Sequence, residues 1–461
     1  MPSGTVVLRD RRGSPRNIHV GQVSVFRRAA SWCIYYRENG KPRKFRIGPD
    51  RREAEQRAAE INAQLAHGLP STFGYERVSV EDLVRLWLEH HELVLRSSVA
   101  TVKRYHAATE HLLNFTRGEH IGLMADCVTP RIAESFVKHL RGLVVSPNGH
   151  SRTPKRKFRD KGLIYILEVC RSLFNYAIRQ RHLPPYAHNP FAELGIERMK
   201  IEDAKPTGVL SQDEEAAFLA ACDPWQFRLF FMLAFTGMRP GELCHLLVED
   251  VNCGGRTMDI RNRPELGWKT KTRNERKVYL FDELSRVVEG ATGSRVCGPL
   301  FLARQFAAGK EPPPLAELDA HALSSELCAR IAAGAQKSGT GWGRIAEERV
   351  GQKLWRDMGA VTPKEVRREF IRVTKNIGRP DLTCPKLWRH QMATAMQEAG
   401  VDPFARKEII GHTRLETTGL YTHTREATLG REMAKVVLLR ENTLNVVRGR
   451  LACVAGSGAG I

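Results

Sequence analysis

Apolar residues near the N-terminus alternate with polar ones over short runs, a period that predicts β-strands. A run rich in Ala, Glu, Arg and Gln follows and predicts a helix over Arg51–Ala66. A basic leader, which we expect to be mobile, precedes the strands, and the breaker Gly68-Leu69-Pro70-Ser71 indicates a boundary near residue 73. The predicted strands are Val23–Phe26, Trp32–Tyr36 and Lys44–Ile47.

From Ser79 onward apolar residues recur every three to four positions, which predicts an all-helical domain. The run Ser146–Lys161 interrupts it, and its cations would suit a phosphate backbone, although a solvated loop fits the composition equally well. Asn189-Pro190 and Asp203–Thr207 indicate a linker into a third part. The predicted helices are Val80–Val94, Ala100–Phe115, Thr129–Leu143 and Gly162–Arg181.

The third part begins with a capping box at Ser211-Gln212-Asp213-Glu214 and continues with the apolar run Phe227–Phe235, which predicts a buried helix. Thr257–Arg261 and Arg276–Leu280 predict two strands joined by a charged turn. Phe301–Arg356 is only weakly periodic, and its sequence assigns it no role. Later helices are predicted over Pro363–Asn376, Trp388–Ala399 and Pro403–Ile410.

Together these elements predict a mainly α protein with small β elements, an α+β chain of two or three domains. The length of 461 residues agrees, because single cores rarely grow beyond roughly 250 to 300 residues. Lys and Arg number 72 against 51 Asp and Glu, a net charge of +21. Such a charge favours a long anionic partner, DNA or RNA first, although charge alone does not exclude an anionic membrane surface.

The ten cysteines are never closer than nine positions in sequence, so no Cys-x-x-Cys metal clip exists and we expect reduced structural thiols. The N-terminal sequence has no apolar segment of a signal peptide, and no run approaches the roughly 18 apolar residues that span a bilayer. We therefore expect a cytoplasmic protein with no membrane partner, no metal and no cofactor.

Four segments carry residues suited to chemistry on a phosphodiester: TGMRPGEL with Arg239, the WKTKTRNERKVYL hairpin, LWRHQMATAMQEAG, and EIIGHTRLETTGLYTH, in which His412 and Tyr421 are nine residues apart. Pro240 fits a first helical position, which would hold Arg239 at a rigid corner. These segments resemble the catalytic boxes of the tyrosine recombinases, the phage-integrase family, which share their catalytic fold with type IB topoisomerases. The resemblance covers roughly residues 205–426.

The resemblance implies that Tyr421 is the nucleophile and that Arg239 and Arg389 bind the phosphate. It also makes Lys271 the hairpin lysine and His412 the histidine near the nucleophile. Lys386 stands where most members have a histidine, a departure that the type IB topoisomerases share. Lys269 is the alternative to Lys271, Glu242 supports the site by orienting groups, and His390 is more consistent with a structural role beside Arg389.

The chemistry agrees with these assignments. A guanidinium meets two phosphate oxygens at once and remains charged without a metal. A tyrosine hydroxyl ordinarily titrates near 10, so Tyr421 needs nearby cations or a base such as His412. The departing 5′ oxygen needs a proton, which Lys271 on a hairpin can supply as general acid.

We therefore expect a site-specific DNA recombinase or integrase that acts on double-stranded DNA as a homotetramer, with or without accessory DNA-bending proteins. Two alternatives stay open: a type IB-like topoisomerase, and a catalytically silent DNA-binding protein of the same fold, suggested by Lys386. The expected domains are an accessory DNA-binding module (1–72), a helical core-binding domain (76–190), the catalytic domain (205–426), and a C-terminal tail (427–461) whose apolar segment Ala434–Leu439 could dock on a neighbouring protomer.

Overall fold

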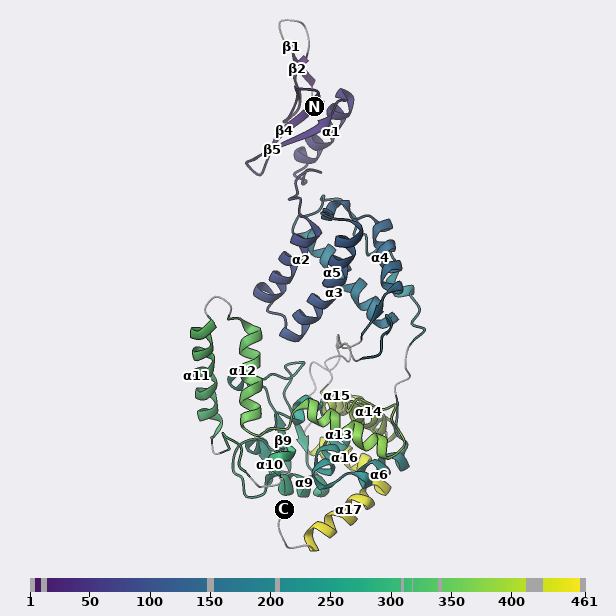
Figure 1. The fold of residues 1–461 in the computed structure, drawn as a ribbon, viewed down its shortest axis with the longest axis vertical. Coiled ribbons are helices and arrows are strands. Elements are labelled where there is room, and N and C mark those ends of the chain that lie inside the picture. Colours follow the sequence, from purple (N-terminus) through teal and green to yellow (C-terminus); the bar gives the residue numbers. More distant parts are fainter. Residues whose placement is uncertain are drawn as a thin grey trace. The chain divides into compact units, whose positions relative to one another are not determined.

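The computed structural model describes residues 5–9, 15–146, 153–203, 208–307, 311–316, 318–338, 342–411 and 426–456. The chain divides into two compact units, residues 1–205 and 206–461 (Figure 1). Helices predominate and the sheets are small and antiparallel, which confirms the predicted fold class. Among the described helices, none is both long enough and apolar enough to cross a bilayer.

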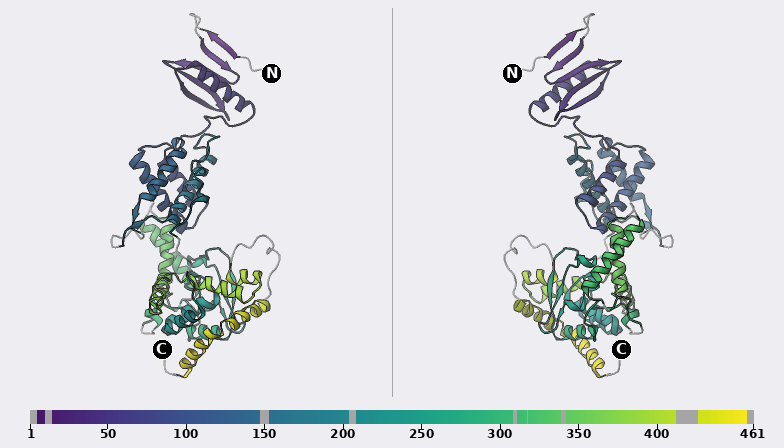
Figure 2. Two further views of the ribbon diagram at one scale, coloured as in Figure 1. Left: turned by 90° about the vertical axis from the view of Figure 1, so that its right-hand side faces the viewer. Right: turned by 90° about the vertical axis from the view of Figure 1, so that its left-hand side faces the viewer.

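A five-stranded antiparallel sheet opens the first unit, with strand order β1-β2-β3-β4-β5. Helix α1 (Arg51–Ala66) lies on the sheet and buries Ala54, Ala58 and Ile61 against it (Figure 2). The three predicted strands are confirmed as β3, β4 and β5. The strands are β1 (Thr5–Arg9), β2 (Pro15–Val20), β3 (Val23–Arg28), β4 (Ser31–Glu38) and β5 (Lys41–Gly48).

The expectation of a mobile leader is wrong for the residues of β1 and β2. Strand β2 pairs with β3 in a register that places Ile18 opposite Val25, and both side chains are completely buried. Strand β1 then pairs with β2 along its length. Burial of Ile18 in the sheet core is the physical reason that this basic segment is ordered, because apolar area is removed from water there.

The rest of the first unit is helical and confirms the four predicted helices, with ends shifted by a few residues. The last five residues of the first of these, His90–Val94, form a π-helix, η1. Within the predicted polar run, β7 (Arg156–Lys157) pairs with β6 (Val144–Val145), while residues 147–152 lie outside the described part. The helices are α2 (Val80–Glu89), α3 (Val99–Glu119), α4 (Pro130–Gly142) and α5 (Asp160–Arg179), with 3-10 turns η2 (Ala125–Cys127) and η3 (Ile196–Arg198).

The second unit is built around α7 (Pro224–Thr236), which is apolar on all sides and buried, as predicted. Ahead of it, α6 (Gln212–Ala221) begins with the predicted capping box of Ser211 and Glu214. A three-stranded sheet, ordered β10-β9-β8, confirms the two predicted strands and adds a short third. These strands are β8 (Val251–Asn252), β9 (Thr257–Ile260) and β10 (Arg276–Tyr279).

Further helices surround this sheet and α7, and three of them confirm the predictions for the last part of the domain. The helices are α8 (Pro240–Leu243), α9 (Asp282–Thr292), α10 (Arg304–Ala307), α11 (Ala320–Ser338), α12 (Arg344–Asp357), α13 (Pro363–Asn376), α14 (Leu387–Glu398), α15 (Pro403–Ile410), α16 (Glu426–Leu439) and α17 (Glu441–Gly456), with 3-10 turns η4 (Val248–Asp250) and η5 (Pro264–Leu266).

Helices α11 and α12, from the stretch that the sequence left without a role, lie side by side (Figure 1). They share a small apolar core of their own with residues of the β9–β10 connection, distinct from the main core around α7. His245 lies where this small core meets the rest of the unit. Its ring stacks on Trp268 and contacts Trp355 edge-on, with ring centroids 4.6 Å apart in each pair.

The apolar segment Ala434–Leu439 belongs to α16 and packs partly on its own chain. Val436 is completely buried in the main core, whereas Leu438 is 72% exposed. The tail therefore contributes to the catalytic unit in cis, which the sequence did not predict. Docking on a neighbouring protomer stays a prediction.

The burial of His245 predicts that the second unit loses stability in acid. Burial lowers the pKa of His245 from 6.5 to about 4, although its hydrogen bond to the Gly241 carbonyl opposes the shift. His245 thus binds a proton more readily in the unfolded chain than in the folded one, so the free energy of unfolding decreases as pH falls below about 6.5. We expect protonation of His245 to lower the free energy of unfolding by about 1–2 kcal/mol between pH 7 and pH 5.

The measurement is the thermal transition of the second unit at both pH values, for the wild type and for His245→Gln. The variant should lose less stability on acidification than the wild type. His321→Gln, a change at an exposed histidine of the same unit, should follow the wild type. Equal losses in all three proteins would contradict the assignment.

Candidate active site

The corner between α7 and α8 is held by a glycine and a proline. Gly237 ends α7 with φ of +60°, and a Cβ there would lie 2.7 Å from Cδ1 of Ile410. Two residues on, Arg239 occupies the position just before α8, and Pro240 is the first helical residue, as the sequence predicted. The conformation and the close packing both require glycine, so the corner that presents Arg239 is fixed by local sequence.

Glu242 is a buried carboxylate that receives two arginines. Arg239 donates from NH1 to Oε1 at 2.6 Å, and its backbone N–H donates to Oε2 at 2.9 Å. Arg276 of β10 donates from NH2 to Oε2 at 2.7 Å. Burial would raise the pKa of Glu242, but the charge and hydrogen bond of Arg276, together with the bonds from Arg239, hold it below its usual value. Glu242 is thus an ionised anchor for both guanidinium groups.

Arg389 of α14 lies beside this cluster and is 3% exposed. It donates from NH1 to the Gly237 carbonyl at 3.0 Å and from NH2 to the Gly411 carbonyl at 3.5 Å. Burial, and then the charge of Arg239, lower its pKa to about 10. Arg389 therefore remains charged at neutral pH but lies where a further negative charge would be favourable.

Among the described residues, two guanidinium groups thus bond the Glu242 carboxylate and the guanidinium of Arg389 lies beside them, which leaves an excess of positive charge in a largely buried place. Arg239 keeps 19% of its side chain exposed, whereas Arg276 keeps 4%. An anion with several oxygens, such as a phosphodiester, would supply the missing negative charge and the acceptors that guanidinium groups prefer. The geometry therefore favours phosphate binding.

Lys386 lies immediately before α14, three residues ahead of Arg389, and is exposed. His390 follows Arg389 and is also exposed. Burial, and then the charges of the neighbouring Lys386 and Arg389, lower the pKa of His390. His390 at neutral pH is thus an uncharged neighbour of the two cations.

Lys271 lies in the connection between β9 and β10 and is exposed, as is Lys269. Between them, Thr270 is 3% exposed, and its N–H donates to Oδ1 of Asn262 at 2.8 Å. The N–H of Arg273 donates to the Thr270 carbonyl at 3.1 Å, which closes a turn around Lys271. The turn is ordered while the lysine side chain is open to solvent.

His412 and Tyr421, the predicted histidine and nucleophile, lie outside the described residues, and their roles stay predictions. Gly411, the residue before His412, is described. Its φ is +72°, and a Cβ there would lie 3.0 Å from NH1 of Arg276. Arg276 also donates from Nε to the Ile409 carbonyl at 3.1 Å, so the chain reaches His412 from a backbone held by two arginines.

The sequence did not single out Arg276, although a signal was present. On β10, Arg276 and Val278 share one face by strand alternation, and Val278 is 3% exposed. That register indicates that Arg276 points toward the interior, whereas Lys277 lies on the other face. A buried arginine on a hairpin strand implies a buried anionic partner, here Glu242.

We expect Arg276→Gln to lower the free energy of unfolding of the second unit by about 2–3 kcal/mol, because a buried charged acceptor loses a donor. The measurement is the calorimetric transition of this unit. Arg261→Gln removes an exposed pair with Asp259 and should cost less than about 1 kcal/mol. Similar effects of the two substitutions would mean that Arg276 does not hold Glu242.

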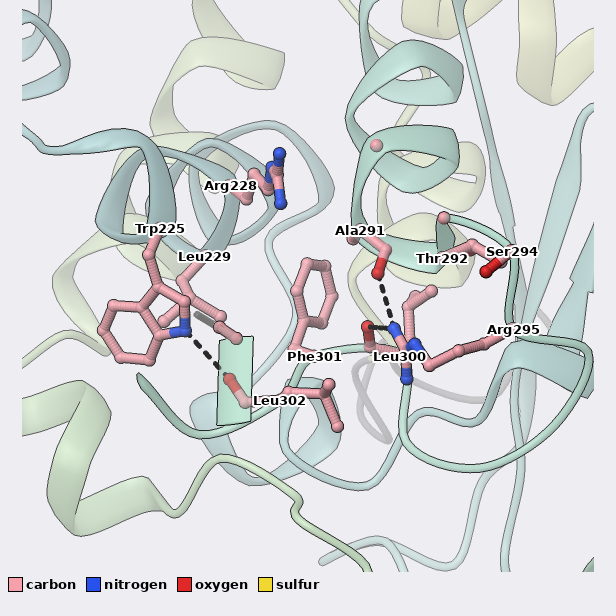
Figure 3. A pocket seen from close by; sticks show the side chains of 13 residues that line it. Trp225, Arg228, Leu229, Ala291, Thr292, Ser294, Arg295, Leu300, Phe301 and Leu302 are labelled. Carbon is pink, nitrogen blue, oxygen red and sulfur yellow. Dashed lines mark hydrogen bonds between the residues drawn. The ribbon is translucent and has the colours of Figure 1, made fainter. Parts of the chain in front are cut away.

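A cavity of about 230 Å³ lies elsewhere in the unit, between α7, α9 and the chain at Leu300–Leu302 (Figure 3). Trp225 donates from Nε1 to the Leu302 carbonyl across it, and Arg295 is bonded to backbone carbonyls of Ala291 and Leu300. Of the predicted catalytic residues that the structure describes, none lines it. The arginine cluster, and not this cavity, is the candidate site.

Comparison with known proteins places the catalytic unit in a family. Residues 208–306 and 356–428 match the model of the phage integrase family. The chain is 27% identical over 350 residues to tyrosine recombinase XerC 2 of Ralstonia nicotianae, covering 74% of this chain and 82% of that protein. It is 37% identical over 82 residues to tyrosine recombinase XerC of Rhodospirillum centenum, covering 18% and 23%.

Among solved structures, a lambda integrase dimer bound to a COC′ core site is similar at 14% identity and a TM-score of 0.46, covering 85% of this chain and 92% of that one. The Tn1549 transposon integrase in complex with circular intermediate DNA is similar at 17% identity and a TM-score of 0.49, covering 77% and 99%. The matched residues 208–306 and 356–428 therefore form a phage integrase domain, and the comparisons support a tyrosine recombinase, a DNA strand transferase.

Proposed function

We propose that this recombinase cleaves and rejoins double-stranded DNA at specific sites through a covalent bond between Tyr421 and a 3′ phosphate. The observation that carries the proposal is the cluster of Arg239, Arg276 and Arg389 around the single carboxylate of Glu242. Its uncompensated positive charge suits a phosphodiester, which gains negative charge on its non-bridging oxygens during displacement.

In the proposed reaction, the Tyr421 oxygen attacks phosphorus while the bond from phosphorus to the 5′ oxygen breaks. His412, aided by the nearby cations, accepts the tyrosine proton. Lys271 gives a proton to the departing 5′ oxygen, with Lys269 as the alternative donor. A 3′ phosphotyrosyl bond and a free 5′ hydroxyl result, so the reverse reaction on a different 5′ hydroxyl rejoins the strand without a nucleotide.

Lys386 would act as a second cation at the phosphate, where most family members have a histidine. Its exposure and its place one helical turn before Arg389 support this role. A lysine cannot accept a proton while it is charged, so deprotonation of Tyr421 would then depend on His412. Glu242 would act only by holding Arg239 and Arg276 in place.

Exchange of two duplexes breaks four strands, so we propose a homotetramer with one Tyr421 for each strand. The net charge of +21 supports a DNA partner, since lysines and arginines supply salt-sensitive affinity for the backbone. Residues 1–72 would form an accessory DNA-binding module, 76–190 a core-binding domain and 205–426 the catalytic domain. The tail, 427–461, would include the contact between protomers, and accessory bending proteins could assist.

A type IB-like topoisomerase is the second candidate, favoured by the lysine at position 386. Both enzymes cleave in the same way, but a topoisomerase reseals the same strand. The test is incubation in EDTA of two different DNA fragments that carry the flanks of this protein's own gene. Joined products containing one end from each fragment would support recombination, whereas relaxation of supercoils without joined products would favour the topoisomerase.

A further inference from the structure

The match to the phage integrase family model stops at residue 306 and resumes at residue 356. The stretch between them contains α11 and nearly all of α12, so these two helices are an insertion relative to the family model. We refer to α11 (Ala320–Ser338) and α12 (Arg344–Asp357) as the inserted helical pair.

The inserted helical pair packs on the β9–β10 connection, which carries Lys271. Leu323 and Leu327 of α11 share one apolar core with Leu266 of η5. Trp355 of α12 is 4% exposed and donates from Nε1 to the Leu266 carbonyl at 2.9 Å. One buried hydrogen bond and a continuous apolar contact therefore join the insertion to the hairpin.

The two backbones also meet directly at a pair of glycines. A Cβ on Gly267 would lie 3.2 Å from Cα of Gly351, and a Cβ on Gly351 would lie 3.4 Å from Cα of Gly267. No side chain separates the two segments at this crossing. A shift of α12 along its axis would therefore move the hairpin backbone, four residues before Lys271.

Between this crossing and Lys271 the hairpin backbone is held by hydrogen bonds and a ring contact. The next residue, Trp268, stacks on His245, and its backbone exchanges two hydrogen bonds with Arg263, each of 3.0 Å. Thr270 is then fixed by Asn262, whose amide also donates to the Arg273 carbonyl at 2.9 Å. Trp268 and Thr270 thus tie the backbone on the way to Lys271 to neighbouring residues of the unit, through ring stacking and hydrogen bonds.

We propose that the inserted helical pair positions the hairpin lysine, so that Trp355 and Gly351 are positioning residues for proton delivery to the departing 5′ oxygen. The inference rests on the proposed function, in which Lys271 is the general acid. The inference adds to that function a role for α11 and α12, which the family model does not contain. The insertion acts on the leaving-group step and leaves phosphate binding by Arg239 and Arg389 unchanged.

The test compares two DNA duplexes at a cleavage position mapped with the wild-type protein: one with the normal 5′ oxygen, the other with sulfur in its place. A thiol is far more acidic than an alcohol, so the thiolate leaves without a proton and the second duplex needs no general acid. Trp355→Phe keeps the aromatic ring but removes the hydrogen bond to Leu266. It should slow single-turnover cleavage of the oxygen duplex about tenfold or more and leave the sulfur duplex at the wild-type rate.

The matched control lies in the same insertion. Trp342 packs against Gly334, and its Nε1 has no hydrogen-bond partner among the described residues, so Trp342→Phe should leave both rates unchanged. Lys271→Ala should show the same pattern as Trp355→Phe in a stronger form.

Equal slowing of both duplexes by Trp355→Phe, or no slowing of either, would overturn the positioning role. Wild-type protein that cleaves neither duplex would instead reject the proposed function, and the inference with it. Slowing by Trp342→Phe equal to that by Trp355→Phe would show that the whole insertion matters only for stability, which also overturns the proposal.

Discussion

Arg389→Lys should lower the rate of DNA cleavage by about 10²- to 10³-fold, the typical effect of removing one preorganised donor from a developing oxyanion. Lysine keeps the positive charge but cannot reproduce the planar fork of a guanidinium. In this chain the fork also bonds to the carbonyls of Gly237 and Gly411, on either side of the site. The measurement is single-turnover cleavage of a duplex that contains the mapped site.

Two controls separate this effect from binding and folding. Arg367→Lys makes the same chemical change at an exposed arginine that donates from Nε to the Thr383 carbonyl, and it should leave the rate within about twofold. DNA affinity of Arg389→Lys should remain close to that of the wild type, since the net charge is unchanged. A cleavage rate for Arg389→Lys equal to the wild-type rate would exclude Arg389 from the catalytic centre.

Arg440→Met should lower the free energy of unfolding of the second unit by about 3–5 kcal/mol, the cost of breaking a buried ion pair. Arg440, between α16 and α17, bonds to Glu215 of α6, and each side chain is 2% exposed. It also donates to the Ala234 carbonyl at 2.8 Å and lies 3.8 Å from the centroid of the Phe235 ring. Burial lowers the pKa of Arg440 to about 9, which shows that the interior disfavours its charge. The ion pair with Glu215 offsets this cost.

The measurement is the calorimetric transition of the second unit. The double variant Glu215→Leu with Arg440→Met should be less destabilised than Arg440→Met alone, because no unpaired carboxylate remains. Arg448→Met, which removes a half-exposed pair with Glu283, should cost less than about 1 kcal/mol. A single variant as stable as the wild type would mean that the C-terminal helices are not held to α6 by this pair.

Elements with strong local signals could be predicted from the sequence. The capping box at Ser211, the proline at 240 and the apolar run of α7 each specify a conformation through neighbouring residues. Arg239 and Arg389 could be found because they lie in sequence motifs of a family. In the structure, Arg239 bonds to the Glu242 carboxylate and Arg389 to the Gly237 carbonyl.

What the sequence could not provide depends on contacts between distant residues. Arg276 meets Glu242 across 34 positions, and Arg440 meets Glu215 across 225, so neither pair has a local pattern. Strand β2 was missed because its burial depends on pairing with β3, and its basic residues suggested a disordered leader. The role that we propose for the inserted helical pair could not be predicted from the sequence, because it depends on the close approach of Gly351 to Gly267 of the hairpin.

The most direct test of the central claim is to identify the residue that becomes joined to DNA. The purified protein is incubated in EDTA with supercoiled DNA carrying the flanks of its own gene, denatured, digested with nuclease and protease, and the modified peptide is sequenced by mass spectrometry. We predict a nucleotide attached through its 3′ phosphate to Tyr421, and no adduct with Tyr421→Phe. A nucleotide on another residue or through a 5′ phosphate, or DNA binding without an adduct, would contradict the account.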